Sequence, residues 1–367
     1  MPELTVIKNE LLPALLAVSG AVDRRQRLPV LSNLLFNFMD TKLSVTATDL
    51  EIEITASINC NASVVTGATT IPAKKFIDII RSLEENIVNI ILNDNNVMIK
   101  SGRSQFKLAT LPVSQFPIED YTASEVTLHV NRANLWQLLQ STHFAISQQE
   151  VRFFLNSLLF EIDGRNITTV AIDGHRMAVC SLETEDTHPI QQFLLPRRGV
   201  LEMLRLLSNV QDETLQIMAS KRYFRVVSKQ YSFITKLTEA RFPSYKKAIT
   251  LDHDKFVQID RDTLKRSLTR IAILANEKSK AVLMHIQPNG LTLIAHNQEQ
   301  EEAKESVEAV IEGHEIKIGV NATYLCDVLH YLPDGLVRLS MTNPDKNILV
   351  QSINNPNYQY IIMPMKI

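Results

Sequence analysis

The sequence is poor in glycine, with 10 glycines in 367 residues against a usual share of about 7%. It has neither a GxGxxG run nor a P-loop, which argues against a glycine-rich loop that holds a nucleotide phosphate. Its three cysteines, Cys60, Cys180 and Cys326, lie far apart. An odd and scattered set does not suit a disulfide framework or a zinc knuckle, and it indicates a reducing compartment.

Long apolar runs are also missing. No stretch approaches the roughly 18 apolar residues of a membrane helix. Lys8 and Glu10 interrupt the apolar residues near the N-terminus, so we expect no signal peptide. The hydrophobic share of 45% and the charged share of 21% are those of a soluble protein with two or three cores. These features predict a cytoplasmic protein with no membrane partner.

What the sequence does contain is a threefold repeat. Ser32-Asn33-Leu34-Leu35 recurs 124 residues later as Asn156-Ser157-Leu158-Leu159, and a similar apolar segment begins at Ala281. Thr48-Asp49 recurs as Ile172-Asp173 at the same offset. A repeat of this length is the size of a domain, so it is not a short-period solenoid. We expect three similar domains over residues 1–123, 124–251 and 252–367.

Each repeat contains two similar halves, in which a short strand leads into an amphipathic helix and then into alternating strands. The six helices are expected near residues 9–19, 73–83, 132–143, 198–208, 262–275 and 322–331. The pattern predicts an α+β fold, with antiparallel sheets that carry their helices on one side.

The polar faces of the expected helices are mainly basic. Segments 8–19, 73–83, 131–143, 196–208, 260–276 and 321–331 hold 12 Lys and Arg but 6 Asp and Glu, although the whole chain has a net charge of −2. A basic face is ordinary for any single surface helix. Six homologous helices on one side of symmetric sheets would instead gather their charges on one surface. This repetition favours binding to the phosphate backbone of nucleic acid, with low base specificity.

Two constellations could carry catalysis, and the sequence favours neither. Asp173-Gly174-His175-Arg176 could orient a histidine base, but no nucleophile motif accompanies it and Asp-Gly also suits a tight turn. The acidic run at Glu299–Glu305 lacks a second carboxylate cluster with metal-ligand spacing. We therefore expect no catalysis at either place, no metal and no cofactor. The apolar C-terminus, Tyr360–Ile367, fits either core burial or a partner groove.

Five motifs are specific enough to identify a family. They are Ser101-Gly102-Arg103-Ser104, Asp173-Gly174-His175-Arg176, Arg241-Phe242-Pro243-x-Tyr245, Asn276-Glu277-Lys278 and Met363-Pro364-Met365. In this order they resemble the bacterial sliding clamps, the beta subunits of DNA polymerase III. The resemblance extends from Leu4 to Ile367.

The resemblance implies the DNA clamp fold, in which three similar domains form half of a closed ring. Two chains would join head to tail as a homodimer around double-stranded DNA. Such a clamp is a non-catalytic processivity factor. Its implied partners are the replicative polymerase catalytic subunit, the clamp loader, and other polymerases and repair proteins that carry short clamp-binding peptides.

The resemblance also implies three sets of site residues. A partner-peptide groove would use Leu155, Ile172, Gly174, His175, Arg176, Met177, Pro243, Lys247, Ile361, Ile362, Met363, Pro364 and Met365. DNA contacts would come from Arg25, Lys74, Gln149, Phe153, Phe154 and Arg198. The ring joint would pair Phe106 and Leu108 with Ile273 and Leu274, while Lys75, Arg103 and Lys107 face Glu299, Glu301, Glu302 and Glu305.

Two alternatives from other classes remain open. One is a nuclease in which the acidic run binds a metal, and the other is a passive protein-binding scaffold. A clamp differs from both because it would stay on circular DNA and slide off a cut circle.

Overall fold

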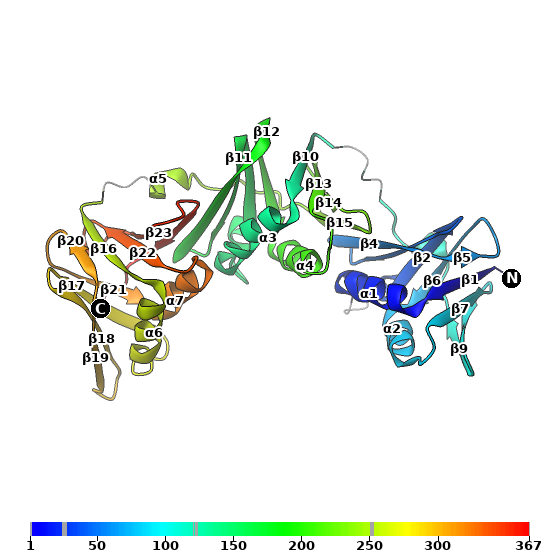
Figure 1. Cartoon of the computed structure of the whole chain (residues 1–367), viewed down its shortest axis with the longest axis horizontal. Coiled ribbons are helices and arrows are strands. Elements are labelled where there is room, and N and C mark those ends of the chain that lie inside the picture. The colour runs from blue at the N-terminus through cyan, green and yellow to red at the C-terminus, as the bar shows by residue number, and fades with distance from the viewer. Residues whose placement is uncertain (1, 24–27, 120, 122–123, 250–252, 367) are drawn as a thin grey trace. The chain divides into compact units, whose positions relative to one another are not determined.

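The computed structural model describes residues 2–23, 28–119, 121, 124–249 and 253–366. The chain forms two compact units, Met1–Ala133 with Arg198–Leu237 and Asn134–Arg197 with Thr238–Ile367. Figure 1 shows the elements of each unit. The expected central domain is therefore divided, with one half in each unit. The expected boundaries after residues 123 and 251 lie outside the described residues and stay a prediction.

All six expected helices are confirmed, with ends that shift by a few residues. They are α1 (Lys8–Val18), α2 (Ala73–Ser82), α3 (Arg132–Gln140), α4 (Arg197–Leu207), α6 (Arg261–Ile271) and α7 (Ala322–Tyr331). The apolar stripe of α6 is buried, with Leu264 and Leu268 both 0% exposed. Asp260 caps the same helix by accepting a hydrogen bond from the backbone N–H of Thr263 at 2.8 Å. The short α5 (Lys246–Ile249) was not expected.

The first unit contains two antiparallel sheets. The five-stranded sheet has the order β5 (Asn61–Ala62), β1 (Glu3–Ile7), β7 (Ile87–Leu92), β8 (Asn96–Ser101), β9 (Ser104–Ala109). The eight-stranded sheet has the order β10 (Val126–Asn131), β13 (Thr214–Ala219), β14 (Tyr223–Val227), β15 (Tyr231–Lys236), β4 (Ile52–Asn59), β3 (Lys42–Thr48), β2 (Asn33–Met39), β6 (Thr66–Pro72). On its helical side, Phe36 of β2 meets Phe76 of α2 edge to face, with ring centroids 5.3 Å apart.

The second unit also contains two antiparallel sheets. The seven-stranded sheet has the order β11 (Ser157–Ile172), β12 (Arg176–Pro196), β24 (Tyr358–Ile362), β23 (Ile348–Ser352), β22 (Leu336–Met341), β16 (Lys255–Asp260), β20 (Val310–Glu312). The four-stranded sheet has the order β19 (Glu302–Val307), β18 (Gly290–His296), β17 (Ala281–Gln287), β21 (Ile316–Asn321). The core of the second unit includes the fully buried Tyr360 of β24, whose hydroxyl donates to the carbonyl oxygen of Ser141 at 3.0 Å. The expected α+β class and the antiparallel pairing are confirmed.

Successive repeats share their sheets, which the sequence did not predict. β15 of the second repeat pairs with β4 of the first, and β24 of the third repeat pairs with β12 of the second. In both cases the last strand of one repeat joins the hairpin of the repeat before it. The strands left over in this order are β9 and β19, and each is an edge strand of its sheet.

A close approach in the first unit gives a test of this packing. Gly199 lies inside α4, where Ala would normally be more stable by about 1 kcal/mol. A Cβ atom at Gly199 would meet the Thr235 side chain of β15, including its Cβ at 3.0 Å. We therefore expect Gly199→Ala to lower the thermal unfolding midpoint, and Gly199→Ala with Thr235→Ala to recover part of the loss. A midpoint raised by Gly199→Ala would contradict this packing.

Candidate functional site

The Asp173-Gly174 segment forms a turn and not a catalytic pair. Asp173 Oδ1 accepts hydrogen bonds from the backbone N–H groups of His175 and Arg176, at 2.9 and 3.0 Å. Gly174 has a φ of +90°, a conformation that favours glycine. Asp49 accepts the same pair of backbone bonds at the equivalent turn of the first repeat, at 3.0 and 2.9 Å. The turn interpretation of this motif is confirmed.

The Arg176 guanidinium is bound within the chain from several sides. Its Nε donates to Asp173 at 2.9 Å, its Nη1 to Asp327 of α7 at 2.5 Å, and its Nη2 to the Phe144 carbonyl oxygen at 3.1 Å. It also lies over the rings of Phe144 and Tyr324, 5.1 and 4.7 Å from their centroids. Arg176 was expected to contact a partner peptide. These contacts make it a link between the start of β12 and α7, and the expected peptide contact stays a prediction.

Part of the expected groove belongs to one group of apolar side chains, which we call the apolar cluster. Its buried members are Leu159, Val170, Met177, Val179, Leu194, Phe242, Tyr245, Leu349 and Ile361, and the partly buried Phe154, Ile172, Ala248 and Ile249 pack against them. Of the expected residues, Ile172, Met177 and Ile361 belong to it. Phe242 and Tyr245 lie in the family motif, yet sequence reasoning missed them. The sequence could not predict that Leu349 belongs to the cluster, because its position depends on which strand β23 pairs with.

The remaining expected groove residues divide between the core and the surface. Leu155 and Ile362 are 1% and 0% exposed, so they lie in the core, and their expected contact with a partner peptide stays a prediction. Pro243 and Lys247 are exposed beside the cluster. Met363 is 48% exposed, and its N–H donates to the His175 carbonyl oxygen.

The tail after Met363 is also bound. The N–H of Met365 donates to the Gly319 carbonyl oxygen at 2.8 Å, and Pro364 between them is half-buried. His175 is exposed and stacks on Tyr324, with ring centroids 5.7 Å apart. Core burial is thus shown for Tyr360, while Met363 lies at the surface and the partner groove stays a prediction.

A buried carboxylate fixes one member of the apolar cluster. The Tyr245 hydroxyl donates to Glu161 at 2.7 Å, and Gln192 donates to the other carboxylate oxygen at 2.6 Å. Lys246 lies 3.2 Å from the same carboxylate. Burial opposes the negative charge, but these three partners together lower the pKa of Glu161. The charged Glu161 thus holds the Tyr245 ring in place.

The first repeat has a polar surface where the second has the apolar cluster. Val170, Ile172, Met177 and Val179 stand 124 residues after Thr46, Thr48, Glu53 and Thr55, and the strand register is the same in both places. The hydroxyls of Thr46 and Thr55 are hydrogen-bonded to each other at 2.9 Å, so this face is polar although it is partly buried. The repeat therefore has an apolar surface at this position in its second copy but not in its first.

The two phenylalanines expected to contact DNA lie differently. Phe153 is 68% exposed and is available to an external partner. Phe154 packs against the apolar cluster, with its ring centroid 6.2 Å from that of Phe242. The expectation of a DNA contact therefore fits Phe153 better than Phe154.

The other residues expected to contact DNA differ in whether their side chains are free to do so. Lys74 and Gln149 are exposed. Arg198 forms an ion pair with Asp49, whose side chain is 6% exposed, and it also donates to the Gly20 carbonyl oxygen at 3.4 Å. A phosphate would have to share Arg198 with that buried carboxylate. Arg25 lies outside the described residues.

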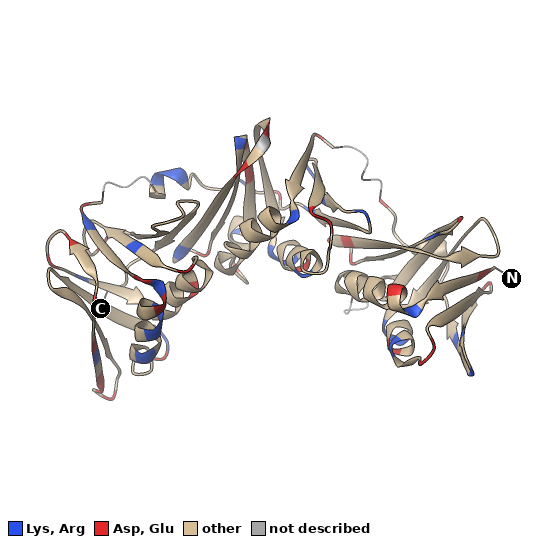
Figure 2. Cartoon of the chain, in the orientation of Figure 1, with Lys and Arg blue, Asp and Glu red and all other residues tan. Residues whose placement is uncertain are grey.

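Several helical cations are also neutralised within the chain. Figure 2 shows Lys and Arg along α6. On this helix Arg261 pairs with Asp262 at 2.7 Å, and Arg270 Nε donates to Glu305 at 3.1 Å. Lys265 approaches His330 Nδ1 at 3.1 Å and has no carboxylate partner among the described residues. The positive surface is therefore smaller than the count of Lys and Arg predicts.

One side of the expected ring joint lies on the edge strand β9. Phe106 and Leu108 are half-buried on that strand, while Lys107 and Arg103 are exposed beside them. Lys75 of α2 is also exposed. Two large apolar side chains on an unpaired edge fit a surface that another strand covers.

The other side of the expected joint lies after α6 and on β19. Ile273 is 77% exposed, Leu274 is half-buried, and both line a cleft of about 400 Å³ together with Glu299 and Glu301. Glu299, Glu301 and Glu302 are exposed, but Glu305 is engaged by Arg270 and by Ser267 at 2.7 Å. Glu305 was expected to face a cation of the second chain; its charge is already paired with Arg270 within the chain, and the expectation stays a prediction.

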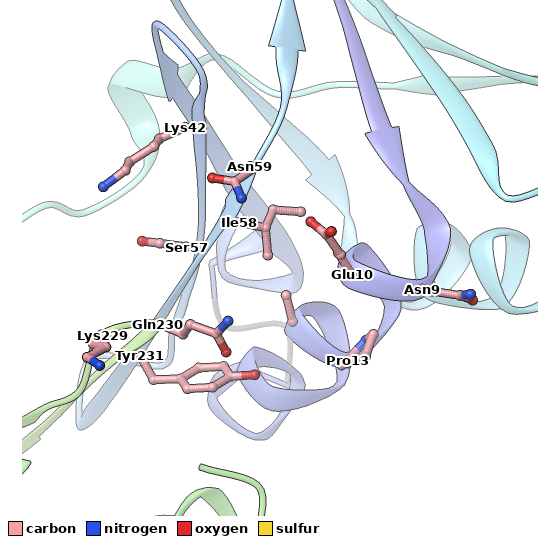
Figure 3. Close-up of a pocket in the computed structure, with 11 residues that line it drawn as sticks. Asn9, Glu10, Pro13, Lys42, Ser57, Ile58, Asn59, Lys229, Gln230 and Tyr231 are labelled. Carbon is pink, nitrogen blue, oxygen red and sulfur yellow. The ribbon is translucent and has the colours of Figure 1, made fainter. Parts of the chain in front are cut away.

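A further cleft in the first unit has no expected site residue. It encloses about 450 Å³ between the start of α1, the β3–β4 hairpin and the β14–β15 turn. Figure 3 shows Glu10, Lys42, Lys229 and Tyr231 among its lining side chains. Both signs of charge line the space, so the cleft does not select for an anion.

Within the described ranges, no group of three or more His, Cys, Asp or Glu side chains is placed to hold a metal ion. The helices of the described residues are all too short or too polar to cross a membrane.

The comparisons with known proteins agree with one another over the whole chain. Family models of the DNA polymerase III beta subunit match residues 2–120 (N-terminal domain), 129–244 (central domain) and 246–366 (C-terminal domain). The beta sliding clamps of Vibrio cholerae and Escherichia coli K12 are each 37% identical to this chain, over 99% of both chains. A solved sliding clamp from Pseudomonas aeruginosa, bound to griselimycin, has a TM-score of 0.95 and 35% identity over the whole of both chains.

The polar surface of the first repeat carries a pH-sensitive group. Burial raises the pKa of Glu53 to about 7, against a hydrogen bond from Tyr121 and the charge of Arg225. The folded state then holds this proton more tightly than the unfolded chain, so stability falls as the pH rises from about 4.5 to about 7. We expect Glu53→Gln to gain stability over the wild type across that window, as measured by urea unfolding.

Glu51→Gln, at an exposed position two residues away, serves as the control and should change little. A Glu53→Gln effect that does not vary between pH 4 and 8 would contradict the raised pKa.

Proposed function

Because the chain belongs to the family of DNA polymerase III beta subunits, the non-catalytic beta sliding clamps, we propose that it closes around double-stranded DNA as a head-to-tail homodimer. In this role it tethers the replicative polymerase, and other proteins that carry short clamp-binding peptides, to DNA without reading its sequence. The observation that carries the proposal is the sheet order, in which β9 and β19 are edge strands that each pair on one side only.

The order of shared strands indicates how two chains would join. β15 extends the sheet of the preceding repeat at β4, and β24 extends that of the preceding repeat at β12. β9 is the corresponding last strand of the first repeat, and β19 is the corresponding hairpin strand of the third. A second copy whose β19 pairs with β9 would continue the same rule. Such a heterologous contact makes a ring when it closes.

The joint depends on apolar contact more than on charge. Phe106 and Leu108 on one side and Ile273 and Leu274 on the other are the apolar groups available. Lys75, Arg103 and Lys107 would face Glu299, Glu301 and Glu302, but exposed ion pairs contribute only about 0–1 kcal/mol each. Glu305 adds little because Arg270 already neutralises it.

The DNA and partner surfaces rest on different residues. We assign DNA contact to two helical cations that have no carboxylate partner among the described residues, Lys74 and Lys265, and to the exposed Phe153 and Gln149. Peptide binding is assigned to the apolar cluster, with Pro243, Lys247 and Met363 at its edge. A chain that offers this apolar surface in one repeat would give a dimer two partner sites.

A nuclease remains the alternative of another class. It would need metal-dependent cleavage of naked DNA by the pure chain, and such cleavage in magnesium would overturn the clamp. As a replication protein the clamp would work in the cytoplasm. Its three domains would divide near residues 123 and 251.

The joint can be tested by one truncation. We expect Leu274→Ala to shift the protein toward monomer at sub-micromolar concentration, because it opens a cavity worth roughly 2–5 kcal/mol. Analytical ultracentrifugation over a dilution series measures the shift. Ile190→Ala, at an equally apolar but 67% exposed position elsewhere, should leave the dimer unchanged. An unchanged dimer in Leu274→Ala would count against this joint.

The partner site can be tested by giving it the residue of the first repeat. Met177→Glu introduces a carboxylate into the apolar cluster, at the position that corresponds to Glu53 in the first repeat. We expect it to reduce the affinity for a labelled Gln-Ala-Ala-Leu-Phe peptide by at least about tenfold, in fluorescence anisotropy, because a charge would enter an apolar contact. Thr55→Glu, the same charge on the polar surface, is the control. Equal affinities for all three proteins would place the peptide elsewhere.

A further inference from the structure

The strand register extends the apolar cluster into a second, polar row of side chains. Antiparallel partners share a face, so Met177, Ile361, Leu349, Ser340 and Phe256 form one row across β12, β24, β23, β22 and β16. The next row on the same face is Val179, Gln359, Gln351, Arg338 and Gln258. Both rows begin in the apolar cluster, at Met177 and Val179. The second row, which we call the polar row, continues directly from it.

Arg338 is the cation of the polar row, and its charge has no partner within the described part of the chain. Its guanidinium lies over the Phe256 ring, 5.5 Å from the centroid. Its Nε is buried and donates no hydrogen bond there. The acidic residues nearest in register form no ion pair with it among the described residues, since Asp260 accepts from Thr263 and Glu312, opposite Phe256, is not bound to Arg338. A half-buried guanidinium held on a ring but without an acceptor is suited to an external carboxylate.

The glutamines on either side of Arg338 could form hydrogen bonds with the main chain of a peptide. Gln258 and Gln351 flank it on the neighbouring strands, and Gln359 follows toward the apolar cluster. All three are half-buried, and within the described ranges their side-chain amides have no hydrogen-bond partner. Each amide offers both a donor and an acceptor. One cation among neutral amides fits a peptide with a single acidic group better than a repeating phosphate backbone.

We propose that a peptide bound at the apolar cluster continues over the polar row and places a carboxylate on Arg338. The spacing sets its sequence. Neighbouring strands lie about 4.8 Å apart and same-face rows about 6.7 Å apart, so Arg338 is roughly 8 Å from Leu349. An extended chain covers about 3.4 Å per residue. The acidic residue therefore stands two or three positions beyond the apolar residue that rests on Leu349. This inference rests on the proposed partner site.

The test compares matched labelled peptides by fluorescence anisotropy. Gln-Ala-Ala-Leu-Phe is extended at its amidated C-terminus by Gly-Gly-Asp or Gly-Gly-Asn. A second pair carries Asp or Asn in place of the first Ala, two positions before Leu and three before Phe. We expect one Asp peptide to bind the wild type about two- to fivefold more tightly than its Asn twin at low salt, with the difference shrinking as salt rises. Arg338→Gln should remove the difference and leave the unextended peptide unaffected. Lys317→Gln, an exposed cation on β21, should keep the difference.

The possible failures are distinguishable. No binding of the unextended peptide to the wild type would overturn the partner site and the extension together. Binding of that peptide with equal affinities for the Asp and Asn forms, or a difference that persists in Arg338→Gln, would overturn the extension alone. Single-stranded DNA that binds the wild type but loses affinity in Arg338→Gln would assign the polar row to nucleic acid, contrary to the proposal.

Discussion

Backbone pairing between successive repeats is the interaction on which the rest of this structure depends. β4 pairs with β15 over five residue pairs, and β12 pairs with β24 over five more. Each ladder merges two repeats into one sheet, so the domains of the repeat are not separate sheets joined by linkers. The same rule leaves β9 and β19 without partners at their sheet edges. An exposed edge strand with apolar side chains is a liability unless something covers it, and in the proposed ring a second copy of the chain would supply the matching edge.

The differences between repeats determine which repeat of the proposed ring carries the partner site. Symmetry alone would place equivalent surfaces on every repeat. In the second repeat the positions beside the shared strand are Val170, Met177 and Val179, and Glu161 fixes Tyr245 over them. In the first repeat threonines and Glu53 stand at the corresponding places. Replacing apolar residues by polar ones removes the transfer free energy that would drive peptide burial, so the proposed partner site would lie in the second repeat and not in the first.

Much of the architecture could be predicted from the sequence. The helices follow from their apolar stripes, as Leu264 and Leu268 of α6 illustrate, and the threefold repeat and the family resemblance are confirmed. The sharing of strands between repeats could not be predicted, because periodicity shows which face of a strand is buried but not which strand lies beside it.

The site residues divide for the same reason. The turn at Asp173 follows from its local sequence. The internal ion pairs of Arg198, Arg176 and Glu305 depend on residues far away in the chain, so charge counts overstated what is free to bind DNA or a second copy. Phe153 and Phe154 are adjacent and chemically identical, and only the fold separates the exposed ring from the packed one.

The most direct test of the central claim is topological retention on DNA. The labelled protein is loaded onto a nicked circular plasmid with a clamp loader and ATP, and then separated by gel filtration in moderate salt before and after a restriction enzyme cuts the circle. A closed ring of two chains predicts that the protein elutes with the circle and is released once the DNA is linear. Equal retention on both forms would indicate ordinary binding, and no retention on either would contradict the ring.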